Sequence, residues 1–149
     1  MRAVIQRVSE ARVSVGDRVL GHIDHGLLVL LGVAESDSQE ESDWMLEKVM
    51  GLRIFANEAG KFDRSLADVG GSLLVVSQFT LLANTSKGKR PSFTAAARPD
   101  VAIPLYERFV AEAVRRGCNV ATGEFGAAMD VHLVNRGPVT IVLDSADRS

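Results

Sequence analysis

Apolar and polar residues alternate over residues 3–23, which is the pattern of half-buried β-strands. Val13 and Val15 precede the pair Gly16-Asp17 and Val19 follows it, so this pair predicts a tight turn between two antiparallel strands. Residues 26–33 form instead a continuous apolar run bracketed by glycines. That run predicts a strand buried on both faces, in the middle of a sheet.

Two segments have the spacing of amphipathic helices. Residues 36–41 contain two overlapping capping boxes, starting at Ser36 or at Ser38, ahead of a run of apolar residues with helical spacing. A second helix is predicted to begin near Pro104, where a missing N–H is harmless, and to end with Gly117 just after its last turn. Charged residues lie opposite its apolar positions, so this helix is expected to bury one face.

The remaining pattern predicts further strands separated by polar loops. The strongest strand covers residues 73–82, which are apolar at first and abruptly polar at Ser77-Gln78. The other predicted strands are 52–55, 119–122, 131–134 and 139–143, with loops at 57–71 and 83–98. Roughly seven strands and two well-separated helices predict an α/β fold, with a sheet or barrel-like β layers covered by two helices on one side. We expect one domain over residues 1–149.

Composition is that of a globular protein, and it excludes one class of function. Of the 149 residues, 46% are hydrophobic and 24% are charged, which argues against a disordered or fibrous chain. The net charge of −2 excludes a protein that coats nucleic acid by bulk positive charge. No Asp or Glu occurs between residues 69 and 99, however, where Lys87, Lys89, Arg90 and Arg98 fall. This stretch is either an ordinary solvated loop or a local site for phosphates.

Cysteine and apolar content bear on the cellular compartment. The single cysteine, Cys118, excludes an intramolecular disulfide and a multi-cysteine zinc site, and it fits a reducing cytosol. The longest apolar run, residues 27–31, is far shorter than the ~20 residues of a membrane span, and no export signal is visible. We therefore expect a cytoplasmic protein that does not bind a membrane.

The histidines do not predict a metal site. His22, Asp24 and His25 are close in sequence, but alternation along a strand places His22 and Asp24 on one face and His25 on the other. His132 lies between apolar strand residues and is read as structural. We expect neither a metal nor a cofactor.

Common catalytic motifs are missing, and one polar segment stands out. The chain contains no nucleophile elbow, P-loop, dinucleotide fingerprint or HExxH helix. Ser77-Gln78-Phe79-Thr80 ends an apolar strand, so it is either a strand emerging into solvent or a set of hydrogen-bonding groups on a rigid support. No acid or histidine adjoins Ser77 or Thr80 in sequence, so a conventional nucleophile and base are not indicated.

Several segments together resemble the D-aminoacyl-tRNA deacylase family over almost the whole chain. They are the opening residues 1–8, Ser77-Gln78-Phe79-Thr80, residues 90–93, residues 122–127 with Met129, and Gly137-Pro138 with the two residues that follow. The Ser-Gln-Phe-Thr and Gly-Pro segments are signature motifs of that family. Arg136 departs from the family, which commonly has an acidic residue before Gly-Pro.

The resemblance implies an activity and a mode of assembly. The activity is hydrolysis of the ester between a D-amino acid and the 3′-terminal adenosine of tRNA. The assembly is a homodimer in which a cis Gly137–Pro138 bond reaches into the partner's pocket, clashes with L-aminoacyl groups, and leaves glycine as a possible substrate. Without the resemblance, a binding module or a hydrolase of another ester would remain open.

The resemblance also implies roles for individual residues. The catalytic segment comprises Gln78, Phe79 and Thr80, with main-chain N–H groups of the last two as oxyanion donors. An attacking water assisted by the ribose 2′-OH is favoured over Thr80 as nucleophile. The substrate-binding residues are Ser77, Gly137, Pro138, Arg7, which would fix the Gly-Pro segment, and Phe125 with Met129, which would receive the adenine.

Overall fold

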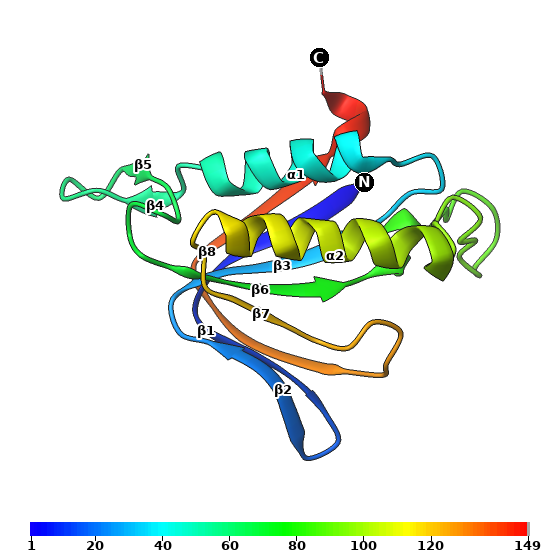
Figure 1. The fold of residues 1–149 in the computed structure, drawn as a ribbon, viewed down its shortest axis with the longest axis horizontal. Helices are drawn as coiled ribbons and strands as arrows, with labels where there is room; N and C mark the ends of the chain where they lie inside the picture. Colours follow the sequence, from blue (N-terminus) through cyan, green and yellow to red (C-terminus); the bar gives the residue numbers. More distant parts are fainter. Residues whose placement is uncertain (149) are drawn as a thin grey trace.

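A long central strand organises the sheet in the computed structural model, which describes residues 1–148 (Figure 1). This strand is β1 (Arg2–Val15). One of its edges pairs antiparallel with β3 (Gly26–Gly32) along its first half and with β2 (Arg18–Ile23) along its second half. Its other edge pairs antiparallel with β8 (Asp130–Asp144). The turn at Gly16-Asp17, where Gly16 has a φ of +56°, is confirmed.

The sheet continues from β3 in parallel. β6 (Ser72–Ser77) pairs with β3, and β7 (Val120–Thr122) pairs with β6, so the buried run of β3 lies mid-sheet as predicted. The sheet curls so far that β2 approaches β7. The close approach is seen at Gly21 of β2, where a Cβ atom would lie only 2.6 Å from the main-chain oxygen of Thr122 in β7. The result is a nearly closed, barrel-like sheet.

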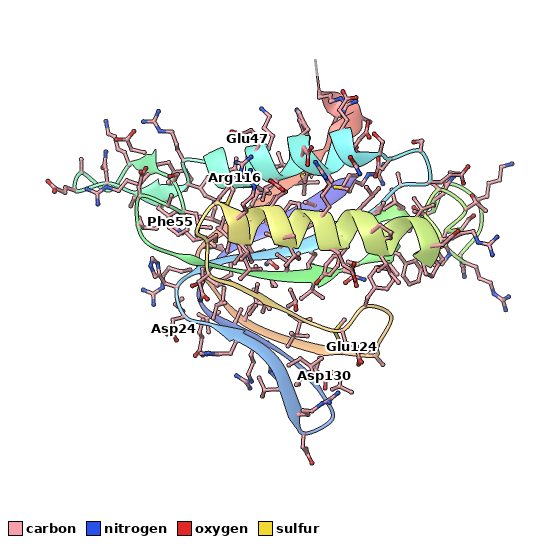
Figure 2. All side chains as sticks on the ribbon, in the orientation of Figure 1. Asp24, Glu47, Phe55, Arg116, Glu124 and Asp130 are labelled. Carbon is pink, nitrogen blue, oxygen red and sulfur yellow. The ribbon has the colours of Figure 1, made fainter. Side chains whose placement is uncertain are left out.

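Both helices cover the same side of this sheet (Figure 1), so the predicted fold class is confirmed. α1 (Gln39–Gly51) begins at the capping box of Ser38 and Glu41, whose carboxylate accepts the Ser38 amide at 2.6 Å. Hydrogen bonds from the Ser38 hydroxyl and amide lower the pKa of Glu41 to about 2. The Arg116 guanidinium lies 2.7 Å from the Glu47 carboxylate and so links the end of α2 (Pro99–Arg115) to α1 (Figure 2).

Two apolar cores lie on the two faces of the sheet. Leu27, Val29 and Leu31 of β3 face the helices and pack with the buried residues of α1 and α2. Leu28 and Leu30 face the other way and pack inside the curl of the sheet. This alternation follows from the two-residue period of a strand.

The remaining elements are short. They are the hairpin of β4 (Phe55–Ala56) and β5 (Phe62–Arg64), and the 3-10 helices η1 (Phe79–Leu82) and η2 (Ser145–Asp147).

Four element boundaries predicted from the pattern were wrong. The strand expected over 73–82 ends at Ser77 and gives way to η1. The second helix begins at Pro99, a proline that also suits the first turn, and Pro104 lies inside the helix on its exposed side. The strand expected over 52–55 starts only at Phe55, and the two C-terminal strands are one continuous β8. Gly117 does follow the last turn of α2, with a φ of +84°.

Candidate active site

A sharp change of backbone direction at the end of β6 builds the candidate site. The main-chain N–H of Gln78 still donates to the main-chain oxygen of Leu31 at 2.8 Å, as it would in a continuing strand. The 3-10 helix η1 starts at the next residue. Gly32 allows this close packing, because a side chain there would meet the Leu82 side chain at 2.6 Å and the Gln78 oxygen at 2.9 Å. The end of β6 is therefore held against the end of β3.

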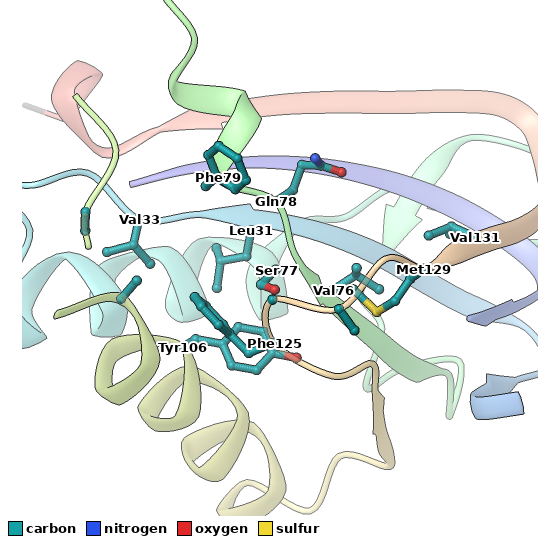
Figure 3. Close-up of a pocket in the computed structure, with 14 residues that line it drawn as sticks. Leu31, Val33, Val76, Ser77, Gln78, Phe79, Tyr106, Phe125, Met129 and Val131 are labelled. Carbon is teal, nitrogen blue, oxygen red and sulfur yellow. The ribbon is translucent and has the colours of Figure 1, made fainter. Parts of the chain in front are cut away.

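A pocket opens at this end of the sheet (Figure 3). It has a volume of about 220 Å³ and lies between the ends of β3 and β6, the start of α2, and the loop that follows β7. Its walls are mostly apolar, and its polar side chains are those of Ser77, Gln78 and Tyr106. The lining residues are Leu31, Val33, Val76, Ser77, Gln78, Phe79, Ala97, Ala102, Tyr106, Phe125, Gly126, Ala127, Met129 and Val131.

Tyr106 forms part of the pocket wall, a position that the sequence pattern did not assign. Its hydroxyl donates to the Val75 oxygen at 2.9 Å, and its ring meets the Phe125 ring edge to face at 6.0 Å. Burial raises the pKa of Tyr106 to about 12, so the phenol stays protonated at neutral pH. From the sequence, helical spacing placed Tyr106 only on a buried face. One further feature could have drawn attention to it as a site residue: it is the only tyrosine of the chain.

Thr80 lies beside the pocket rather than in its wall. Thr80 is exposed. Among the described residues, its hydroxyl has one side-chain partner, the side-chain amide of Gln78, whose N–H donates to the Thr80 oxygen. Of the residues that line the pocket, Tyr106 is the only one with a titratable side chain. The pocket therefore contains no carboxylate or imidazole that could act as a general base for Thr80.

The first N–H groups of η1 are available for a ligand. The amides of Phe79 and Thr80 have no main-chain acceptor among residues 1–148, as expected at the start of a helix. The Phe79 ring is 55% exposed and rests edge to face on Phe93, with ring centroids 5.2 Å apart. The site thus combines an apolar pocket with two main-chain donors at its rim.

The Gly137-Pro138 segment projects from β8 and is exposed. Its peptide bond is cis. The segment belongs to a short excursion, residues 136–139, because β8 pairs with β1 at Asn135 and again at Thr140. The Asn135 side chain closes the excursion by accepting the Val139 amide at 2.7 Å.

Arg7 braces this excursion from β1. Its guanidinium donates to the Arg136 oxygen and to the Ile54 oxygen, each at 2.8 Å, and it lies 5.4 Å from the centre of the Phe62 ring. Arg7 therefore ties the segment before Gly137 to the chain between α1 and β4.

The two signature segments lie at opposite ends of the sheet. Ser77 pairs with Leu31, whereas Arg7 pairs with Leu27 of the same strand. Four residues of β-strand separate the two positions by roughly 13 Å.

Two labelled residues in Figure 2 make the separation visible. Phe55 shares a surface hollow with Arg7, and Glu124 adjoins the pocket residue Phe125. In that view Phe55 lies on the left of the molecule and Glu124 lies lower, to the right of the centre. Within one chain, Ser77, Gln78, Phe79, Phe125 and Met129 are together, and Arg7, Gly137 and Pro138 are elsewhere.

The other residues considered from the sequence form no second site. The His22 and Asp24 side chains are 3.9 Å apart and exposed, and the His25 ring contacts the Val69 oxygen at 3.1 Å. No group of three or more metal-ligating side chains occurs within residues 1–148. Burial raises the pKa of the Cys118 thiol. None of the described helices combines the length and the apolar character needed to cross a bilayer.

The fold and the site together define a class of protein. It is an α/β protein with a barrel-like sheet, two helices on one side, and a strand-end pocket that has main-chain donors but no acid–base pair. Such a pocket can hold an apolar group and place main-chain hydrogen-bond donors beside it.

Comparison with known proteins identifies the family. The family model described as D-Tyr-tRNA(Tyr) deacylase matches residues 4–144. A D-aminoacyl-tRNA deacylase of Roseiflexus sp. (strain RS-1) is 59% identical over 98% of this chain and 94% of its own, and one of Thermus aquaticus is 54% identical over 99% and 97%. This chain belongs to the D-Tyr-tRNA(Tyr) deacylase family, a family of hydrolases.

Solved structures agree with the fold. One titled "c-Myc DNA Unwinding Element Binding Protein" superposes with a TM-score of 0.90 at 41% identity, over 97% of this chain and 99% of its own. Another, described as a probable eukaryotic D-amino acid tRNA deacylase, gives a TM-score of 0.84 at 18% identity, over 95% and 97%. The second likeness concerns the fold alone.

Proposed function

We propose that residues 1–149 act as one domain that hydrolyses the ester of D-aminoacyl-tRNA and releases a free D-amino acid and tRNA. Family membership supports the reaction, and the pocket at the end of β6, formed in part by the family's own Ser77-Gln78-Phe79 segment, carries the proposal. A tRNA substrate implies a cytoplasmic location.

Hydrolysis proceeds by attack of water on the ester carbonyl. The new oxygen–carbon bond forms as the carbonyl oxygen becomes an oxyanion, which the amides of Phe79 and Thr80 stabilise by about 3 kcal/mol each. The carbon–oxygen bond to the ribose then breaks, and the water proton passes to the ribose oxygen that leaves. Because the pocket walls offer no base, the neighbouring ribose 2′-OH orients the water. Gln78 fixes Thr80 through its hydrogen bond.

The apolar side of the pocket receives the terminal adenine. Phe125 and Met129 both line it, and Tyr106 supports the Phe125 ring from behind. Ser77 contributes the hydroxyl nearest the end of β6. An aromatic and a thioether group suit the flat face of a base.

Chirality is read by Gly137 and Pro138 of a second copy of the chain. In one copy these residues are exposed and distant from the pocket, so they can reach a pocket only in a partner. Their carbonyl groups, fixed through Arg7, hold the substrate's α-amino group and leave no room for an L side chain. Because main-chain atoms do the reading, many D side chains are accepted, and glycine, with no side chain to clash, also reacts.

An apolar patch supports the homodimer. Val4 pairs with Leu30 on one side and with Val142 on the other, so the three side chains form a row on the sheet face that lacks helices. Val142 is 68% exposed. Apolar rows on an uncovered sheet face commonly mark contact with another protein.

The activity is tested by following deacylation of matched D-tyrosyl-, L-tyrosyl- and glycyl-tRNA. Rapid hydrolysis of the D form, slower loss of glycine, and no loss of the L form support the proposal. Equal rates on the D and L forms, or binding without turnover, would overturn it. A marked preference for D-tyrosyl-tRNA over a simple D-tyrosine ester separates this function from a general esterase.

The trans arrangement is tested with two complementary variants. Pro138→Ala damages the Gly-Pro segment, and Ala127→Trp fills the pocket. Each homodimer is expected to be inactive, whereas mixed dimers contain one undamaged pocket facing one undamaged Gly-Pro segment. Activity that returns on co-expression supports the arrangement, and mixed dimers as inactive as their parents refute it.

A further inference from the structure

A loop without acidic residues leaves the pocket rim and returns to it. The chain lines the pocket at Phe79, departs, and lines it again at Ala97. The amides and oxygens of Asn84 and Ser92 pair with each other at 2.7 and 2.9 Å, which closes residues 85–91 into a separate loop. We call residues 85–91 the basic loop. At 3.3–3.6 Å per residue, half of this loop can extend about 12 Å from its base.

The charges of the basic loop are not neutralised. Lys87, Lys89 and Arg90 are exposed, and none of the three forms an ion pair with another residue of the described chain, 1–148. Arginines that connect the helices behave differently: Arg108 pairs with Asp43 at 2.8 Å, and Arg116 pairs with Glu47 at 2.7 Å. The arginines between the helices are therefore neutralised by carboxylates, whereas the three cations of the basic loop remain available to bind an anion.

Packing and hydrogen-bond contacts join the base of the basic loop to the pocket. Phe93 follows the Ser92 base of the loop, and its ring packs on the Phe79 ring, which belongs to the pocket rim. A second link is the isolated bridge between Ala34 and Ala96, where the Glu35 amide donates to the Ala95 oxygen at 2.9 Å. The base of the basic loop is thus held at a defined place relative to the pocket mouth.

We propose that the basic loop binds the RNA phosphates that precede the terminal nucleotide of the substrate. The inference rests on the proposed function, because a terminal nucleotide in the pocket sends the preceding nucleotides out past the rim. Three unpaired cations within reach of that rim suit a sugar–phosphate chain. The loop acts on binding of the RNA and takes no part in the chemistry of the ester.

The test compares two substrates that share the ester and differ in the RNA. One is D-tyrosyl-tRNA, and the other is D-tyrosyl-adenosine, which keeps the terminal nucleoside and lacks the preceding phosphates. The variant carries Lys87→Gln, Lys89→Gln and Arg90→Gln together. A matched control, Lys48→Gln, removes an exposed cation of α1 on the helical side of the molecule.

With the triple variant, kcat/KM for D-tyrosyl-tRNA is expected to fall about tenfold at low salt, mainly through KM. The slope of log kcat/KM against log salt concentration should become shallower by about 2 to 3, because each lost phosphate contact reduces the slope by a little under 1. Hydrolysis of D-tyrosyl-adenosine should not change. Each single substitution should have a smaller effect than the triple variant, and Lys48→Gln should leave both substrates unaffected.

Three outcomes overturn the inference. An unchanged rate on tRNA shows that the loop does not bind it, and an equal loss on both substrates shows that the loop shapes the pocket instead. If the triple variant keeps the salt dependence of kcat/KM that the unaltered protein has, the phosphates are bound by another surface. If the unaltered protein hydrolyses neither substrate, the proposed function itself has failed, and this result is distinct from the other three.

Discussion

Replacing Thr80 by alanine distinguishes the two possible mechanisms. If Thr80 were the nucleophile, its hydroxyl would need a base within hydrogen-bonding distance to take the proton. The side-chain partner that the structure provides is the Gln78 amide, and this group donates to the Thr80 oxygen. An amide N–H cannot accept the proton. We therefore expect Thr80→Ala to lose only a modest part of its activity.

The size of the expected loss follows from the one contact that the substitution removes. Loss of a single, exposed hydrogen bond between neutral groups costs about 0.5 to 1.5 kcal/mol. If the whole of this cost appeared in the transition state, kcat/KM would fall by about 2- to 13-fold. Removal of a covalent nucleophile typically lowers kcat by about a thousandfold or more. The two predictions therefore do not overlap.

The assay is single-turnover hydrolysis of D-tyrosyl-tRNA with enzyme in excess, so that slow release of product does not conceal the chemical step. Thr80→Ser serves as the control, because it keeps the hydroxyl while removing the methyl group. A thousandfold loss in Thr80→Ala that Thr80→Ser restores, or a tyrosyl ester trapped on Thr80 and detected by mass spectrometry, would refute water attack.

Three further substitutions test how the site is supported. Gly32→Ala places a methyl group 2.6 Å from the Leu82 side chain and should lower the free energy of unfolding in urea by about 1 to 3 kcal/mol. Tyr106→Phe removes the buried hydrogen bond to Val75, so it should cost about 1 kcal/mol of stability in the same assay and leave the pH profile of kcat unchanged near neutrality. Glu41→Gln keeps an acceptor for Ser38 but loses the charge that pairs with Arg148 at 2.9 Å, so it should cost about 1 kcal/mol at pH 7. Because the folded pKa of Glu41 is lowered from 4.5 to about 2, this difference should be full above pH 4.5 and vanish as the pH falls toward 2.

Local features of the fold could be predicted because short-range rules decide them. The capping box at Ser38, the tight turn at Gly16-Asp17 and the glycine after α2 each depend on a few neighbouring residues. The polar end of the strand at Ser77 was visible for the same reason, since an apolar run that stops abruptly marks where a strand leaves the core.

Boundaries and pocket walls were harder because distant parts of the chain decide them. Phe79, Leu81 and Leu82 bring back an apolar pattern that suits a strand, but the chain turns into η1 where Gln78 and Leu82 pack closely on Gly32. Tyr106 reads only as a buried helical residue until α2 is placed against β6. The separation of Ser77 from Gly137 depends on β8 pairing with β1, which joins residues more than a hundred positions apart and has no local signature.

If the proposed homodimer forms, that separation would let a short chain build a selective site. The pocket alone offers an ester an apolar wall and main-chain donors, and in the proposed function it is not the part that tells a D from an L substituent. The Gly-Pro segment could make that distinction, yet it projects from the other end of the sheet, braced by Arg7 against the Ile54 and Arg136 oxygens. In the proposed homodimer, a two-fold arrangement of two chains would bring each segment to the partner's pocket and form two equivalent composite sites. On this proposal the pocket and the group that holds the substrate's α-amino group belong to different chains, so a separated monomer should hydrolyse neither D- nor L-aminoacyl-tRNA even where its pocket is undamaged.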